Sequence, residues 1–174
     1  MNKKILILDY SVGNIESIIK AVNYLGYTPI FSNNKNDIAK ANKIILPGQG
    51  SYNYAMNKIL ELDLLELLTR KNSKEGIPIL GICLGMQILS SMGYEDQKTE
   101  GLNFIPGKVK ILKKNPYKLP HIGWNSVKYI QKNDKILKNL EDEKDFYFIH
   151  SFYFDCEKKG NEIAKTFYNQ SFSS

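Results

Sequence analysis

Cys83 is the residue with the clearest potential for covalent chemistry, because it stands between two glycines in the stretch GICLG, directly after the apolar run IPIL. A strand that enters a helix through a one-residue corner brings the residues two before and two after the corner close together, so only very small side chains fit there. Gly81 and Gly85 meet that requirement. The pattern predicts a nucleophile elbow with Cys83 at its apex, although a small cysteine packed between glycines in an α/β core fits the same residues.

Acyl chemistry at Cys83 needs a reactive sulfur and donors for an oxyanion. A helix that begins at the corner points its free N–H groups toward the sulfur, so we expect a lowered thiol pKa. Attack on a carbonyl creates an oxyanion that backbone N–H groups must stabilise, and Leu84 is the expected first donor. The second is expected from the loop LPGQGSY at 46–52, whose glycines allow close approach of backbone amides. An ordinary glycine turn is an equally good interpretation of that loop.

The elements that position these residues alternate between apolar, β-branched runs and segments of helical period, as in βα units. Strands are expected at 4–9, 28–32, 43–47 and 77–82, and helices at 15–25, 37–41 and 52–68. The last of these strands, IPILGI, is interpreted as central and buried on both faces. After Gly93 the aromatic and alternating runs at 107–114, 126–130 and 145–154 indicate an antiparallel extension of the sheet. The expected fold is therefore α/β, a three-layer open, mainly parallel sheet with an antiparallel extension.

Composition narrows the classes of function. The 174-residue chain is expected to form a single domain over 1–174, and it carries a net charge of +6 but a single arginine, Arg70, which disfavours specific nucleic-acid contacts. No apolar run reaches membrane-spanning length and no signal peptide is recognised, so a cytoplasmic location is expected. The cysteines and histidines, Cys83, Cys156, His121 and His150, show no zinc-binding spacing. Neither a disulfide nor a metal nor another cofactor is expected.

Six segments follow one another along the chain: DYSVGNIESIIKA, LPGQGSY, GICLGMQIL, GLNFIPGKV, PHIGWN and YFIHSFY. In that order and at those separations they resemble the glutaminase subunits of imidazole glycerol phosphate synthases. The resemblance implies the class I glutamine amidotransferase fold, which is flavodoxin-like, and a Cys-His-Glu triad that hydrolyses glutamine. It also implies a heterodimer in which ammonia passes to a (β/α)8-barrel cyclase subunit during histidine biosynthesis.

The resemblance implies roles for individual residues. Cys83 would be the nucleophile, and the oxyanion donors would be the backbone amides of Leu84, Gly48 and Gln49. The substrate-binding residues would be Gly50, Gln87, His150, Ser151 and Phe152, and the partner interface would include His121, Trp124 and Asn125. Two simpler interpretations stay open: Gln87 as a helix residue that satisfies buried backbone groups, and Trp124 with His121 as core packing.

The sequence also departs from the family it resembles. Relatives carry the catalytic histidine and glutamate in a Phe-His-Pro-Glu segment that this chain lacks, and neither His121 nor His150 inherits the role of base. We therefore expect little or no glutaminase activity from the chain as written. Gln49 stands where relatives usually have an apolar residue. The alternatives are an ammonia-supplying subunit for amidation of a surface sugar, and a non-catalytic binding subunit; a general cysteine hydrolase is disfavoured by the PHIGWN segment.

Overall fold

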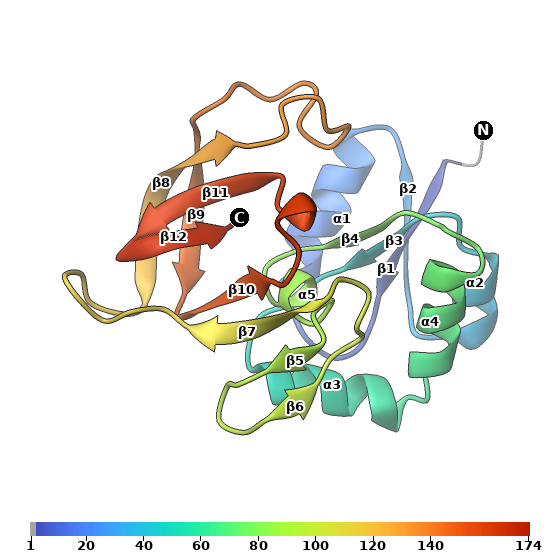
Figure 1. The fold of residues 1–174 in the computed structure, drawn as a ribbon. Helices are drawn as coiled ribbons and strands as arrows, with labels where there is room; N and C mark the ends of the chain where they lie inside the picture. Colours follow the sequence, from blue (N-terminus) through green and yellow to red (C-terminus); the bar gives the residue numbers. More distant parts are fainter. Residues whose placement is uncertain (1–2) are drawn as a thin grey trace. The chain divides into compact units, whose positions relative to one another are not determined.

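The computed structural model describes residues 3–174, which divide after Phe104 into two compact units (Figure 1). Unit 1 is of α/β type, and unit 2, residues 105–174, consists mainly of antiparallel strands. The single domain expected from the sequence stays a prediction, since one domain can contain two such units. No helix among residues 3–174 has the length and apolar character that crossing a membrane requires.

The sheet of unit 1 has four parallel strands in the order β2-β1-β3-β4. Their bounds are β1 (Lys4–Leu8), β2 (Thr28–Ser32), β3 (Ile44–Leu46) and β4 (Ile79–Gly81). The prediction of a parallel sheet with helical crossovers is confirmed. The prediction of a central, fully buried strand at 77–82 is wrong, because β4 lies at the edge of the sheet and Leu80 and Ile82 are exposed.

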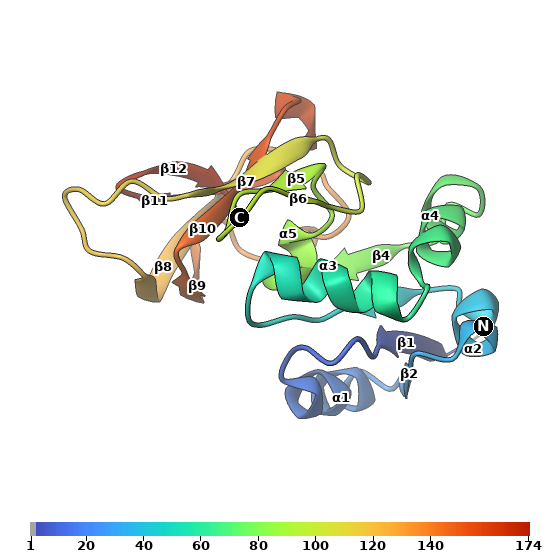
Figure 2. The ribbon, with the colours of Figure 1, turned by 90° about the horizontal axis from the view of Figure 1, so that it is seen from below.

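Helices cover both faces of this sheet, with α1 on one face and α3 on the other (Figure 2). The helices of unit 1 are α1 (Ile15–Tyr24), α2 (Lys35–Lys40), α3 (Tyr52–Glu61), α4 (Leu65–Ser73) and α5 (Leu84–Gln87). Ile7 and Ile45 pack against Val22 of α1, so alternate residues of the strands face opposite helical layers. The three-layer α/β arrangement of this unit is therefore confirmed.

The helix predicted over 52–68 is interrupted. It forms as α3 and α4, and Asp63 between them adopts a left-handed φ of 53° that no helix continues. Apolar spacing alone did not reveal the break, because Leu64 and Leu68 are buried on the far side of it as well. Unit 1 ends with a short antiparallel hairpin of β5 (Met92–Gly93) and β6 (Thr99–Glu100).

Unit 2 is an antiparallel sheet in the strand order β7-β10-β12-β11-β8-β9. The bounds are β7 (Gly107–Ile111), β8 (His121–Tyr129), β9 (Lys144–His150), β10 (Phe152–Cys156), β11 (Ala164–Tyr168) and β12 (Gln170–Ser173), with a 3₁₀ turn η1 (Lys159–Asn161). The predicted antiparallel character is confirmed. The run 145–154 forms two strands rather than one, because the chain bends at Ser151: β9 before the bend pairs with β8, and β10 after it pairs with β7.

Candidate active site

Cys83 lies at the corner between β4 and α5, with a φ of 54° and a ψ of −114°. A positive φ is rare for a residue with a side chain, and holding one costs on the order of 1–3 kcal/mol. Such strain persists where the surrounding structure enforces it, and in a nucleophile elbow the strained turn exposes the side chain at its apex. The geometry has the form of the nucleophile elbow that the GICLG pattern predicts.

The two glycines of the elbow are where the backbone comes closest. A Cβ added at Gly81 would lie 2.5 Å from the backbone N of Met86, and one added at Gly85 would lie 1.9 Å from the carbonyl oxygen of Leu46. No side chain fits at either distance, since even close carbon–oxygen contacts are about 3.3 Å. The elbow therefore requires glycine on both sides of Cys83 for steric reasons.

The thiol of Cys83 is free and the residue is exposed. Desolvation by the surrounding protein raises the pKa of this thiol, and a hydrogen bond from the Leu84 N–H to the sulfur opposes the rise without cancelling it. The expectation of a lowered pKa is therefore wrong. Its physical basis was the dipole of the following helix, but α5 spans only Leu84–Gln87, too short to outweigh loss of water around the sulfur.

The loop after β3 lies against the elbow. A Cβ added at Gly48 would lie 2.8 Å from the Cβ of Leu84 and 2.9 Å from the N of Gly85. The loop then enters α3 through Ser51, whose hydroxyl accepts from the Tyr54 N–H at 3.3 Å. The structure thus brings the backbone of Gly48 next to Leu84, the residue expected to give the first oxyanion donor.

The remaining predicted residues of unit 1 lie close by in sequence and in structure. Gln49 and Gly50 are exposed in the same loop, and Gly50 has a φ of 110°. Gln87 is buried at 9% exposure, and its backbone N–H donates to the Cys83 carbonyl at 3.1 Å. A contact of the Gln87 side chain with substrate stays a prediction.

In unit 2 the two histidines form a hydrogen-bonded pair. His121 Nδ1 lies 2.9 Å from His150 Nε2, and the outer nitrogens lie 3.3 Å from Asn125 Nδ2 and 2.7 Å from the Phe152 carbonyl oxygen. A single set of tautomers satisfies the whole chain of bonds: Asn125 donates to His121, His121 to His150, and His150 to the carbonyl. All four imidazole nitrogens of the protein are therefore engaged.

Burial keeps this histidine pair neutral. His121 is 3% exposed, and its ring stacks on Phe148 and Tyr168 at centroid separations of 4.9 and 4.0 Å. Desolvation, with a smaller contribution from His150, lowers the pKa of His121 to about 4. Desolvation also lowers the pKa of His150, against the opposing effect of the Phe152 carbonyl. Neither ring is charged at neutral pH.

The hairpin of β8 and β9 presents an exposed apolar face, made by Ile122, Trp124, Tyr147 and Ile149. Trp124 is 72% exposed, and its ring packs edge-on against Tyr147 at a centroid distance of 5.7 Å. Because side chains alternate along a strand, His121 and Asn125 point to the opposite, inner side of β8. Of the three residues predicted for a partner interface, the structure brings only Trp124 to this exposed face.

Comparison with known proteins assigns the chain to a family. The sequence profile described as "Glutamine amidotransferase class-I" matches residues 6–173. The chain belongs to the class I glutamine amidotransferase family. It is 43% identical over 171 residues to imidazole glycerol phosphate synthase subunit HisH 2 of Methanococcus maripaludis, covering 98% of this chain and 84% of that protein. It is 44% identical over 158 residues to the HisH 2 subunit of Vibrio vulnificus, covering 90% and 73% of the two chains.

Solved structures support the fold of this amidotransferase. A crystal structure of a glutamine amidotransferase matches with a TM-score of 0.71 at 16% identity, covering 92% of this chain and 79% of that one. A glutamine amidotransferase from Thermotoga maritima matches with a TM-score of 0.64 at 19% identity, covering 98% and 73%. The class I amidotransferase fold expected from the sequence is confirmed.

Sequence reasoning missed one residue at the amidotransferase elbow. Tyr10 is fully buried, and its hydroxyl donates to the carbonyl oxygen of Pro47, the residue before Gly48. It lies in the segment DYSVGN, which carries part of the family resemblance. The available signal was its place two residues after β1, whose carboxyl end neighbours that of β3.

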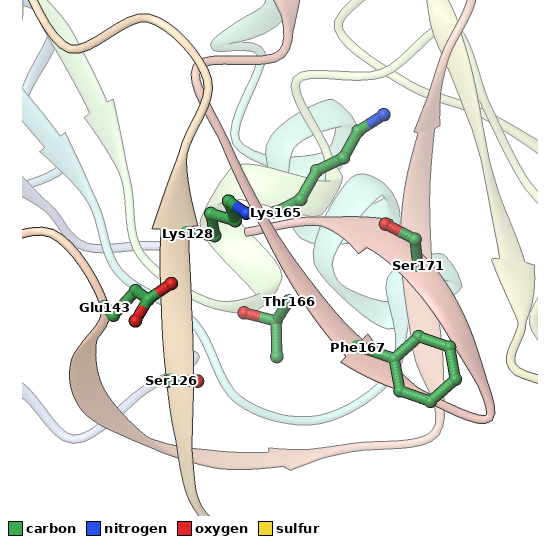
Figure 3. Close-up of a pocket in the computed structure, with 7 residues that line it drawn as sticks. All are labelled: Ser126, Lys128, Glu143, Lys165, Thr166, Phe167 and Ser171. Carbon is green, nitrogen blue, oxygen red and sulfur yellow. The ribbon is translucent and has the colours of Figure 1, made fainter.

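Unit 2 of the amidotransferase also has a shallow hollow of about 240 Å³ (Figure 3). Lys128 and Lys165 line it together with Glu143, and Lys165 is already paired with Glu162 at 2.7 Å. Its charges are therefore largely balanced, and no ligand is assigned to it. Among residues 3–174 the structure groups no three His, Cys, Asp or Glu side chains as metal ligands would be.

Proposed function

We propose that this chain is the glutaminase part of an imidazole glycerol phosphate synthase, and that it acts in the cytoplasm, where free thiols stay reduced. In this role it hydrolyses glutamine and delivers ammonia to a cyclase subunit in histidine biosynthesis. The names of the relatives support the pathway. The observation that carries the chemistry is the strained Cys83, with the Leu84 N–H and the backbone of Gly48 beside it.

The reaction proceeds in two balanced steps. The sulfur of Cys83 adds to the side-chain amide carbon of glutamine, and the negative charge that develops on the amide oxygen is stabilised by N–H groups of Leu84, Gly48 and Gln49. The C–N bond then breaks, and the thiol proton leaves with ammonia. Water breaks the resulting C–S bond, which releases glutamate and restores the thiol.

Turnover by residues 3–174 alone is slow in this proposal. The thiolate is the reactive form of cysteine, and the raised pKa of Cys83 keeps most of the sulfur protonated at neutral pH. A general base would remove that proton, but the nitrogens of His121 and His150 are all engaged in hydrogen bonds. General-base assistance contributes about two to four orders of magnitude in rate, and neither histidine of residues 3–174 has a free nitrogen to give it.

The partner in this proposal is a (β/α)8-barrel cyclase that forms a heterodimer with the chain. The exposed apolar face of β8 and β9 supports a contact surface, since aromatic side chains anchor protein interfaces. Trp124 is the largest of these aromatic side chains and is 72% exposed, and its ring packs edge-on against Tyr147.

The test is glutamate release from glutamine, measured with and without a purified cyclase subunit. We expect slow release that the Cys83→Ala variant abolishes and the Cys156→Ala variant, which removes the other thiol, leaves unchanged. Release unaffected by Cys83→Ala would contradict the nucleophile assignment. No release by the natural chain, even with the cyclase subunit present, would favour a non-catalytic binding subunit. Ordinary turnover by the chain alone would contradict the argument from the engaged histidines.

A further inference from the structure

Tyr10 contacts the loop beside the elbow, and the reaction steps proposed above assign this residue no role. Its side chain is 0% exposed, and its hydroxyl donates to the Pro47 carbonyl oxygen. The parallel register of Ile7 with Ile45 brings the ends of β1 and β3 together, which sets this contact between residues far apart in the sequence. The hydrogen bond is therefore built into the pairing of the two strands.

That hydrogen bond fixes the plane of one peptide group. The Pro47–Gly48 peptide is trans, so its C=O and N–H point in opposite directions. Holding the carbonyl oxygen on Tyr10 thus directs the Gly48 N–H away from Tyr10. This N–H belongs to the segment that the proposed function assigns to the oxyanion.

The peptide needs such a restraint because its own residues cannot provide one. Gly48 has to be glycine, since a Cβ there would lie 2.8 Å from the Leu84 Cβ. Glycine adopts both signs of φ at little cost, so only contacts with neighbouring groups fix the orientation of this peptide. Gly13 also packs against this peptide, since an added Cβ would lie 3.1 Å from the Gly48 nitrogen, but it offers no side chain to fix the plane.

We propose that Tyr10 is a positioning residue for glutamine hydrolysis, which holds the Pro47–Gly48 peptide so that the Gly48 N–H is presented to the developing oxyanion. The proposal rests on the proposed function of the elbow. Tyr10 acts through the loop and takes no proton from the substrate. Burial and the neighbouring Cys83 raise the pKa of the Tyr10 hydroxyl above its usual range, so it remains a neutral donor over the working range of pH.

Tyr10→Phe removes only the hydroxyl, and Tyr52→Phe is its matched control. Tyr52 is also fully buried in unit 1, but it is the first residue of α3, and its hydroxyl bonds the Ser90 hydroxyl at 2.9 Å instead of a carbonyl of the loop 46–51. Each variant is compared with the natural chain for labelling of Cys83 by two electrophiles. The first, the glutamine analogue 6-diazo-5-oxo-L-norleucine, needs the substrate site, whereas iodoacetamide needs only the thiol. The amide NMR resonance of Gly48 reports the peptide itself.

For Tyr10→Phe we expect the ratio of analogue to iodoacetamide labelling rates to fall by about tenfold or more, short of the several-hundredfold cost of losing an oxyanion donor outright. The Gly48 resonance should shift or broaden. Tyr52→Phe should change neither. Equal ratios for the two variants, or an unchanged Gly48 resonance in Tyr10→Phe, would overturn the proposal. If the natural chain itself reacts with the analogue no faster than a free thiol does, the proposed function fails, and the Gly48 resonance alone then decides whether Tyr10 holds the loop.

Discussion

Replacing Gly85 by alanine tests the geometry of the elbow. The added Cβ would lie 1.9 Å from the Leu46 carbonyl oxygen and 2.7 Å from its carbonyl carbon. Carbon–oxygen contacts are seldom closer than about 3.3 Å, so β3 and the elbow must separate by roughly 1.4 Å. Both partners are backbone, and neither can turn aside as a flexible side chain would.

The cost of that separation follows from overpacking. Insertion of a methyl group into a close-packed site typically costs about 1–3 kcal/mol, and a clash between two backbones lies at the upper end, about 3 kcal/mol. For a chain of this size each kcal/mol lowers Tm by about 2–4 °C, so Gly85→Ala should lower it by roughly 6–12 °C. The shift also moves Gly48 away from Leu84, so labelling of Cys83 by the glutamine analogue should fall more than labelling by iodoacetamide.

The assay is thermal unfolding, followed by labelling at a temperature where both proteins are folded. Gly160→Ala is the matched control, because a Cβ there meets nothing within 4 Å. Its effect should stay within about 0.5 kcal/mol, as for ordinary surface positions. If Gly85→Ala unfolds at the same temperature as Gly160→Ala, the close approach of the elbow to β3 does not exist in solution and the steric reasoning is refuted.

Three further outcomes follow from the structure. The pKa of His121 is lowered to about 4 and that of His150 is also lowered, whereas unfolded histidine titrates near 6.5, so between these values the unfolded chain binds more protons. The free energy of unfolding in urea should therefore fall as the pH falls from about 6.5 to 4, by at most about 3 kcal/mol for His121, and an unfolding free energy independent of pH would contradict the neutral pair. Lys71→Met leaves the carbonyl oxygens of Ala39 and Ala41, at the end of α2, without their buried ammonium donor, and it should lower the free energy of unfolding in urea by about 1–3 kcal/mol. Lys35→Met, in an exposed ion pair, should lower it by less than about 1 kcal/mol, and equal costs would refute this role of Lys71. Trp124→Ala should leave Tm nearly unchanged but weaken cyclase binding by about 2 kcal/mol or more in calorimetry, and unchanged affinity would remove this residue from the interface.

Features that depend on neighbouring residues could be predicted from the sequence. The strand at 4–9 and the helix at 15–25 were placed almost as they occur, because apolar period is a local signal. The elbow also followed from five consecutive residues, because the close approach of Gly81 to Met86 is local in the sequence, whereas the contact of Gly85 with Leu46 depends on β3 lying beside the elbow. The parallel and antiparallel parts of the fold followed from the change in pattern after Gly93.

Features that depend on strand register or burial could not be predicted in this way. The Tyr10 contact requires the pairing of β1 with β3, and the histidine pair requires His121 to stand opposite His150 in β8 and β9. The sign of the pKa change at Cys83 depends on how much water the folded chain excludes from the sulfur, which no local pattern reports. The break at Asp63 is a backbone choice that apolar spacing does not encode.

The central claim is that the elbow around Cys83 binds glutamine and presents the reactive thiol to it. Its most direct test is to label the protein with 6-diazo-5-oxo-L-norleucine and to identify the modified thiol by mass spectrometry. Cys156, free and half-buried, is the internal comparison in the same chain. We predict an adduct on Cys83 alone, formed faster as the pH rises because the thiolate must form, and suppressed by excess glutamine. Equal modification of both thiols, or modification of Cys83 that glutamine does not suppress, would contradict it.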